Sequence, residues 1–203
     1  MFDKAALKLT KPMIDGIARR LLALGITADQ ITFKGFAIGM MAAALIAFSH
    51  PVLAIVPLLL GRMCDGLDGA MARISNTQTD RGAFLDIALD FVFYASVPLA
   101  FAVTDPVHNA LAGAVLLAAF ITTGTSFLAY AAIAAKRGET SSDYPTKGIY
   151  YLGGLTEGSE TIALFLAFCI WPNFFAPLAY FYVVLCAFTT LTRIWAGYHR
   201  FGR

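Results

Sequence analysis

Long apolar runs, each about the length of a membrane span, alternate along the chain with short polar or turn-forming segments. A helix needs about 20 mainly apolar residues to cross ~30 Å of hydrocarbon, and the spacing here predicts six transmembrane helices. They are expected over residues 31–49, 51–74, 82–103, 107–135, 150–171 and 174–198. The expected fold class is therefore an all-α integral membrane protein, with residues 1–203 forming a single membrane-embedded domain.

Residues 1–28 differ from the spans, because basic residues are mixed there with Leu and Ile at helical spacing. A basic amphipathic segment beside a span is typical of an interfacial, juxtamembrane helix that lies against anionic headgroups. Pro12 is expected to divide it into two short helices, because proline interrupts the hydrogen bonding of a helix. An ordinary solvated helix is the alternative interpretation.

The amino-acid composition is typical of a membrane protein, and the sequence also argues against one class of binding partner. Of the 203 residues, 59% are hydrophobic and 14% are charged, whereas a soluble domain carries about a quarter charged residues. The sequence has no basic stripe with interleaved aromatic residues, so nucleic acid is not an expected partner. Cys64, Cys169 and Cys186 lie in apolar runs without metal-ligand spacing and are interpreted as packing residues.

The positions of the basic residues predict the orientation in the membrane. None of the 15 Lys and Arg residues falls in the turns at 49–51, 104–108 or 171–173. Because basic residues gather on the cytoplasmic side, these turns are expected outside and both termini inside. In a bacterium the location would be the inner membrane.

Residues 65–90, with the sequence DGLDGAMARISNTQTDRGAFLDIALD, hold five aspartates in an otherwise strongly apolar chain, and four of them form two pairs. The pairs Asp65/Asp68 and Asp86/Asp90 have spacings of three and four, which put each pair on one helix face. The polar run between them predicts a loop, so a helical hairpin is expected to gather the carboxylates at the cytoplasmic side. Hard divalent cations take oxygen ligands of this kind. A polar helix pair lining an ion or proton pathway is the alternative.

The same stretch matches the pattern D-x2-D-G-x2-A-R-x8-G-x3-D-x3-D at every specified position. It resembles the CDP-alcohol phosphotransferases, integral-membrane enzymes that make phospholipid headgroup esters. The resemblance implies that Asp65, Asp68, Asp86 and Asp90 hold two Mg²⁺ or Mn²⁺ ions. It also implies that Asp90 is the catalytic base for the acceptor's proton, although the sequence leaves open whether Asp90 is base, ligand or both.

The resemblance also implies contacts to the CDP-linked substrate. The entrance of the first span, ADQITFKG, is similar to the family's P-N-x-x-T-x-x-G signature, which assigns nucleotide contacts to Asp29 and Thr32. A helix N-cap by Thr27 or Asp29 is the alternative. The other expected contacts are Gly69, Ala72, Arg73, Thr79 and Gly82. Small residues let a base or phosphate approach the backbone, and an arginine fork suits phosphate oxygens, although topology alone also explains Arg73.

The acceptor site is expected near the start of the fifth span. The segment GGLTEG looks like the N-G-x-T-E-G stretch of the family's choline/ethanolamine branch, and also like a small group of bacterial inner-membrane members. Glu157 and Glu160 share one helix face there and could bind the acceptor; the alternative is that the helix dipole favours acids at this position. Lys136, Arg137 and Lys147 could instead receive an acceptor phosphate, and topology alone explains them equally well.

The predicted function is transfer of a phosphatidyl group from CDP-diacylglycerol to the hydroxyl of a small alcohol, such as glycerol 3-phosphate, with release of CMP. One alternative reverses the substrates, so that another CDP-alcohol donates its headgroup to diacylglycerol. A second is a non-enzymatic transporter or scaffold; the intact aspartates and the lack of paired inverted halves in the sequence argue against it. The expected assembly is a homodimer in the lipid bilayer.

Overall fold

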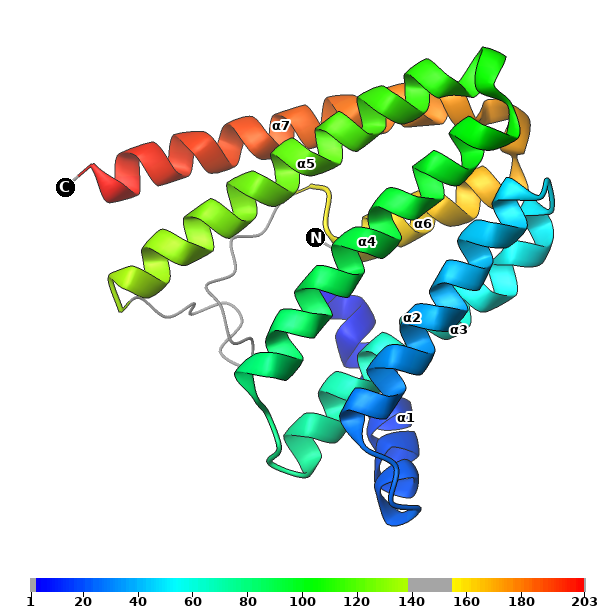
Figure 1. Cartoon of the computed structure of the whole chain (residues 1–203). Coiled ribbons are helices and arrows are strands. Elements are labelled where there is room, and N and C mark those ends of the chain that lie inside the picture. The colour runs from blue at the N-terminus through cyan, green and yellow to red at the C-terminus, as the bar shows by residue number, and fades with distance from the viewer. Residues whose placement is uncertain (1–2, 139–154, 203) are drawn as a thin grey trace.

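The computed structural model describes residues 3–138 and 155–202, and their arrangement is drawn in Figure 1. Every regular element in these two ranges is helical, which confirms the expected all-α class. In chain order the elements are α1 (Asp3–Ala23), α2 (Ala28–Ala47), α3 (Pro51–Ile74), α4 (Asp80–Thr104), α5 (Pro106–Lys136), α6 (Gly158–Ile170), the 3₁₀ turn η1 (Pro172–Phe174) and α7 (Phe175–Phe201).

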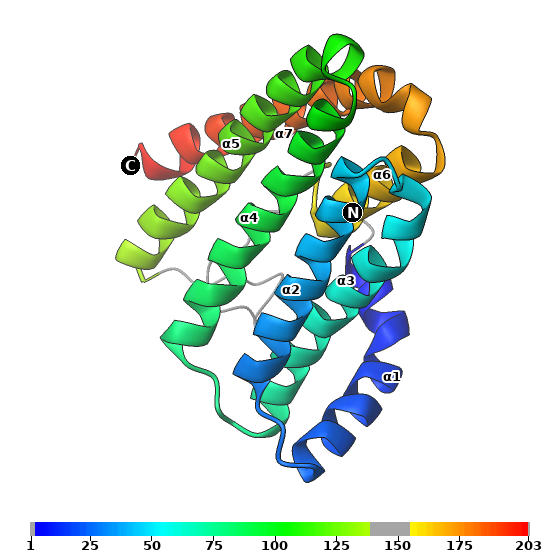
Figure 2. The same cartoon turned by 45° about the vertical axis from the view of Figure 1, so that its right-hand side comes forward.

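The helices pack as neighbours in a single bundle. α2 packs along α3, α4 contacts both α2 and α5, and α5 also packs along α7 (Figures 1 and 2). The turns after α2, α4 and α6 lie at one end of the bundle, while the loop after α3 lies at the opposite end in both views. α1 packs on α3, where Ala18 is buried against Leu67 and Met71.

Four of the helical segments are long and apolar enough to cross a membrane: Ala28–Ala47, Asp80–Thr104, Pro106–Lys136 and Pro172–Phe201. α6 is apolar but has 13 residues, which corresponds to a length of about 20 Å. α3 is as long as a span, with 24 residues. Its second half contains Asp65 and Asp68, and these charged side chains lower the mean hydropathy of the helix. The described residues thus confirm the helical membrane character, with four candidate spans and one shorter apolar helix among them.

The fifth span is expected over residues 150–171, and in the part that the structure describes its helix begins later than expected. Residues 150–154 lie outside the described residues, but residues 155–157 are not helical, and α6 begins at Gly158. The reason is bonding to α7. The Thr189 hydroxyl oxygen accepts hydrogen bonds from the Leu155 N–H (3.2 Å) and the Thr156 hydroxyl (3.1 Å).

The expected division of residues 1–28 at Pro12 is also wrong. α1 runs through Pro12 as one helix of 21 residues. A proline removes one backbone hydrogen bond from the ladder. The other bonds of this helix are sufficient to continue it on both sides.

The helices beside the acidic segment begin at caps that the sequence encodes. At α2, Thr27 Oγ1 accepts a hydrogen bond from the Gln30 N–H (3.3 Å), and the Gln30 side chain accepts one from the Thr27 N–H (3.2 Å). This reciprocal pair is a capping box, so Thr27 is the N-cap. At α4, Thr79 Oγ1 accepts a hydrogen bond from the Gly82 N–H (3.1 Å). These caps fix where α2 and α4 begin.

α2 and α3 approach closely because glycines lie at their crossing. A Cβ atom added to Gly35 would lie 2.6 Å from the Cys64 Cβ. One added to Gly61 would lie 3.1 Å from the Gly35 carbonyl oxygen and 3.2 Å from the Gly39 Cα. Small residues permit this close approach of membrane helices. The crossing places the polar half of α3 against the first turns of α2.

Replacing Gly35 with alanine is expected to destabilise the protein by roughly 1–3 kcal/mol, because the new methyl group would push α2 away from α3. Gly16→Ala in α1 is the matched control, since an added Cβ there has nothing within 4 Å. Thermal unfolding in detergent measures both variants. Equal melting temperatures for the two variants would contradict the close crossing.

Candidate active site

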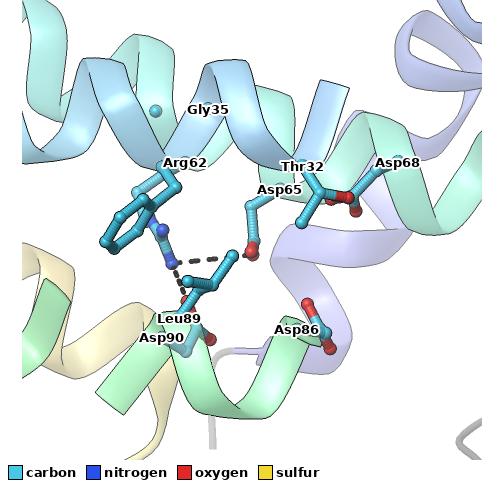
Figure 3. A pocket seen from close by; sticks show the side chains of 10 residues that line it. Thr32, Gly35, Arg62, Asp65, Asp68, Asp86, Leu89 and Asp90 are labelled. Atoms are coloured by element: carbon cyan, nitrogen blue, oxygen red, sulfur yellow. Dashed lines mark hydrogen bonds and ion pairs between the residues drawn. The ribbon is translucent and has the colours of Figure 1, made fainter. Parts of the chain in front are cut away.

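Four aspartates from two helices line one pocket beside the α2–α3 crossing. Asp65 and Asp68 come from α3, and Asp86 and Asp90 come from α4 (Figure 3). The other residues that line the pocket are Thr32, Gly35, Phe36, Gly61, Arg62 and Leu89. The helical hairpin therefore brings together the two pairs that the sequence places on separate helix faces.

Arg62 brings a positive charge into this acidic pocket. Its Nη1 atom lies 2.5 Å from Asp90 Oδ1 and 3.6 Å from Asp65 Oδ2, and its side chain is 15% exposed. Its guanidinium carbon also lies 4.5 Å from the ring centroid of Phe93 and 5.9 Å from that of Tyr94. Charges removed from water are stabilised only when they are paired. Arg62 therefore compensates part of the negative charge of the aspartates.

Asp68 is buried and is held by α2. Thr32 Oγ1 donates a hydrogen bond to Asp68 Oδ2 at 2.5 Å, and the same hydroxyl lies 3.2 Å from the Ala28 carbonyl oxygen. Thr32 thereby fixes the orientation of one carboxylate of the motif. Asp86 is exposed and lies on the other side of the pocket from Arg62 (Figure 3).

The donor atoms suit a hard divalent cation, because four carboxylates and one hydroxyl surround the pocket. In the conformation described, Asp68 is turned toward Thr32 and Asp90 toward Arg62. Within residues 3–138 and 155–202, no group of three or more His, Cys, Asp or Glu side chains is arranged to hold an ion as it stands.

Three residues expected to contact the nucleotide lie at helix starts near the pocket. Asp29, in the first turn of α2, forms an ion pair with Arg81 of α4. Thr79 is the N-cap of α4, and a Cβ added to Gly82 would lie 3.4 Å from its Oγ1. These residues have clear structural roles, and the ion pair ties the first turns of α2 and α4 together.

Gly69, Ala72 and Arg73 follow Asp68 in the last turns of α3. A Cβ added to Gly69 would lie 3.2 Å from Arg73 Nη1, so the glycine leaves room for the guanidinium along the helix. Arg73 is exposed and Ala72 is half-buried. Arg73 is therefore an exposed cation at the end of α3, where the loop to α4 begins.

Among the acceptor candidates, Glu157 is buried at the start of α6. It is the N-cap of α6, is 7% exposed, and forms no side-chain capping hydrogen bond, so a simple helix-start role does not account for it. A Cβ added to the next residue, Gly158, would lie 3.6 Å from the Tyr94 hydroxyl oxygen. Tyr94 in turn lies beside Arg62. The start of α6 is therefore linked to the pocket through α4.

The other residues expected to bind the acceptor lie on different elements or outside the described residues. Glu160 is half-buried and accepts a hydrogen bond from Ser159 (3.2 Å). The Arg137 guanidinium donates to the last carbonyls of α7, those of Arg200 (3.2 Å) and Phe201 (3.1 Å), which is typical of a basic residue at a helix C-terminus. Lys136 is exposed at the end of α5, and Lys147 lies outside the described residues.

Sequence reasoning missed three arginines that have specific partners. Arg62 pairs with Asp90, Arg81 pairs with Asp29, and Arg193 of α7 is 6% exposed and donates to the Thr123 carbonyl oxygen (3.2 Å). A signal was present for Arg62 and Arg193, because each interrupts an expected span. Charged residues inside a membrane almost always have a partner or a function.

Together, the fold and the pocket define a helical membrane protein with an acidic, oxygen-rich site between α2, α3 and α4. The CDP-alcohol phosphatidyltransferase family matches the chain over residues 25–195, and the chain belongs to this family. The expected enzyme class, a phosphotransferase, is thereby confirmed.

Individual relatives agree with this assignment. The inner membrane protein YnjF of Escherichia coli K12 is 50% identical over 198 residues, which cover 98% of this chain and 96% of that protein. The archaetidylinositol phosphate synthase of Pyrococcus horikoshii is 35% identical over 97 residues, 48% of this chain and 51% of that protein.

Solved structures of the Mycobacterium tuberculosis phosphatidylinositol phosphate synthase PgsA1 share the fold. The structure with CDP-DAG bound gives a TM-score of 0.73 at 22% identity and covers 92% of this chain and 94% of that one. The structure with manganese and citrate gives a TM-score of 0.71 at 23% identity and covers 91% and 88%. The helices of this chain are therefore arranged as they are in PgsA1.

Proposed function

We propose that the protein transfers a phosphatidyl group from CDP-diacylglycerol to the hydroxyl of a small alcohol and releases CMP. The observation that carries the proposal is the pocket in which the two aspartate pairs of the motif meet. Family membership supports the reaction type, and the CDP-DAG complex of the mycobacterial neighbour supports the donor. The apolar helices and the E. coli relative support a location in an inner membrane.

The four aspartates are proposed as ligands of two divalent ions, Mg²⁺ or Mn²⁺. Their carboxylate oxygens are the donors that such ions prefer, and the manganese complex of the mycobacterial neighbour supports this class of cofactor. When bound, the ions supply positive charge to the pyrophosphate oxygens and to the oxygen that leaves with CMP.

The residues of the chain then have separate tasks. Asp90 is proposed as the base that takes the proton from the acceptor hydroxyl. The hydroxyl oxygen forms a bond to the phosphatidyl phosphorus, and the bond from that phosphorus to the bridging oxygen breaks as CMP leaves. Thr32 orients Asp68 through its hydrogen bond, and Arg73 offers a fork of donors to phosphate oxygens. The remaining proposed nucleotide contacts are Asp29, Gly69, Ala72, Thr79 and Gly82.

A panel of donors and acceptors tests the proposed reaction against its alternatives. Purified protein is given CDP-diacylglycerol with glycerol 3-phosphate, or with inositol phosphate, the headgroup in the names of two relatives. In parallel it is given CDP-choline or CDP-ethanolamine with diacylglycerol. CMP release only with CDP-diacylglycerol supports the proposal. Release only from the headgroup donors would establish the reversed reaction, and no release with any pair would favour a non-enzymatic role.

Glu157→Gln is expected to raise the KM of the acceptor alcohol and leave that of CDP-diacylglycerol unchanged. Glu157 is buried at the start of α6, which is linked to the aspartate pocket through Tyr94 of α4. Loss of a charged hydrogen bond costs about 1.5–3 kcal/mol, roughly tenfold to a hundredfold in kcat/KM for the acceptor. Steady-state kinetics with each substrate varied in turn makes the measurement. Unchanged acceptor kinetics would leave Glu157 a structural residue, and lost metal affinity would assign it to the aspartate site.

The proposed topology has six spans, with both termini on the cytoplasmic side. The proposed assembly is a homodimer. Cysteine introduced at Val107, which is 88% exposed in the first turn of α5, is expected to react with an impermeant thiol reagent added outside cells. Cysteine at the exposed Thr77, in the loop after α3, is expected to react only after the cells are opened. The parent protein gives the background of its native cysteines. Labelling of Thr77→Cys from outside would reverse the orientation.

A further inference from the structure

Most of the buried polar side chains in the described part of the chain lie away from the aspartate pocket, where α7 meets α5 and the start of α6. They are Thr123 of α5, Thr156, Glu157 and Thr161 at the start of α6, and Thr189 and Arg193 of α7. The buried positions of α7 recur at intervals of three and four residues, which puts them on one face of the helix. This face includes Tyr182, Cys186, Thr189 and Arg193. α7 therefore turns a polar face toward α5 and the start of α6, and polar residues inside a membrane helix usually have a function.

Thr189 of this face holds the chain that leads into α6. Thr189 is completely buried, and its hydroxyl oxygen accepts the hydrogen bonds from the Leu155 N–H (3.2 Å) and the Thr156 hydroxyl (3.1 Å). Residues 155–157, drawn in yellow before α6 in Figure 1, are not helical. Glu157 follows Thr156 directly and has extended backbone angles, with φ at −99° and ψ at −174°. The two bonds to Thr189 therefore fix the position of the backbone that carries Glu157.

A second contact with the same face of α7 holds Glu157 from the other side. The hydroxyl oxygen of Tyr182, seven residues before Thr189, lies 2.8 Å from Thr161 Oγ1. The Thr161 hydroxyl donates a hydrogen bond to the Glu157 carbonyl oxygen at 2.9 Å. Glu157 thus lies between two points of contact with α7, and it is 7% exposed. A side chain on a backbone that is already fixed loses less freedom when it binds a ligand.

We propose that Thr189 is a positioning residue for the acceptor alcohol, because its hydroxyl holds Glu157 where the carboxylate binds that alcohol. This inference rests on the proposed function, in which Glu157 contacts the acceptor; a carboxylate accepts hydrogen bonds from hydroxyl groups. None of the described residues that line the aspartate pocket belongs to α7, so α7 acts on the reaction through the elements that it contacts. The proposed contacts to the CDP-linked donor lie on α2, on α3 and at the start of α4, so binding of the donor does not depend on Thr189.

Thr189→Val tests this role, because valine has nearly the shape of threonine and lacks its hydroxyl. With glycerol 3-phosphate or inositol phosphate as the acceptor, the variant is expected to raise the acceptor KM about tenfold, because the chain before Glu157 loses its bonds to α7. The KM of CDP-diacylglycerol should stay within about twofold of wild type. Thr189→Ser, which keeps the hydroxyl, should restore the acceptor KM. Steady-state CMP release with each substrate varied in turn makes the measurement.

Thr190→Val is the matched control for a general loss of stability. Thr190 is the next residue of α7, and its Oγ1 atom lies 3.1 Å from Thr123 Oγ1 of α5. The same change of side chain there removes a hydroxyl contact between helices but leaves the bonds to residues 155 and 156 intact. It should lower the melting temperature and leave the acceptor KM unchanged. Equal changes of the acceptor KM in Thr189→Val and Thr190→Val would overturn the proposed role of Thr189.

A double variant shows whether Thr189 acts through Glu157. Once Glu157 is replaced by glutamine, Thr189→Val should change the acceptor KM by less than about twofold, because residues that act as a unit do not have additive effects. A full tenfold effect in the Glu157→Gln background would contradict the positioning role. If Thr189→Val does not fold, Thr156→Val removes the other hydroxyl of the same hydrogen bond and should raise the acceptor KM in the same direction. An unchanged acceptor KM in Thr156→Val would then overturn the role.

Failure of this role and failure of the proposed function give different results. If wild type transfers the phosphatidyl group and Glu157→Gln raises the acceptor KM while Thr189→Val does not, Thr189 is not a positioning residue and the proposed function stands. If Glu157→Gln leaves the acceptor KM unchanged, the role of Thr189 fails and the transfer reaction remains. If wild type releases no CMP from CDP-diacylglycerol with either acceptor, the proposed function fails, and the role of Thr189 fails with it.

Discussion

Replacing Asp86 with asparagine is expected to lower CMP release from CDP-diacylglycerol by roughly a thousandfold or more, because an ion that stabilises the transition state by several kcal/mol would lose a ligand. Asparagine keeps the size of the side chain but removes the negative charge. Asp86 is exposed at the pocket, so the change should leave the core of the bundle intact. The measurement is CMP released per purified protein at fixed Mn²⁺, with unfolding followed in parallel.

Asp80→Asn is the matched control for this result. Asp80 begins the same helix, is exposed, and does not line the pocket. Surface changes of this kind usually alter free energies by less than about 0.5 kcal/mol, so its activity should stay within about twofold of wild type. Equal losses in the two variants would mean that a general effect on α4, and not the pocket, explains the result.

Removal of divalent ions is expected to abolish CMP release completely, and added Mg²⁺ or Mn²⁺ should restore it. The reason is electrostatic, because the four carboxylates and the pyrophosphate of the donor would otherwise face one another, and among the described residues that line the pocket Arg62 alone is basic. The experiment follows CMP release in excess EDTA and after the ion is returned. Melting temperature in EDTA is recorded on the same sample, so that loss of activity can be distinguished from unfolding. Full activity in excess EDTA would exclude a metal mechanism.

Most helix boundaries could be predicted because the chain marks them with local signals. Pro51 at the start of α3 and the polar loop before α4 gave boundaries within a few residues of those observed. The start of α6 could not be predicted in this way. Thr156 there is bonded to Thr189 of α7, 33 residues further on, and such a distant partner leaves no local pattern.

In the candidate site, too, features set by local spacing could be predicted, whereas contacts between residues far apart in the sequence could not. Spacing alone placed each aspartate pair on a helix face, and the hairpin brings the pairs to one pocket. The ion pair between Arg62 and Asp90 joins residues 28 positions apart. It depends on the α2–α3 crossing and on the buried ring of Phe93, which only the tertiary packing reveals. The sequence could have drawn attention to Arg62 as a charge in an apolar run, but not to its partner.

The proposed phosphatidyl transfer is tested most directly by following both halves of CDP-diacylglycerol after incubation with the purified protein. The donor is incubated with Mn²⁺ and a mixture of small polar alcohols, and both CMP and the lipid products are quantified by mass. One new phosphatidyl ester is expected for every CMP released, and neither product is expected from Asp86→Asn. Phosphatidic acid as the only lipid product would show a hydrolase, and intact donor under all conditions would contradict the proposed reaction.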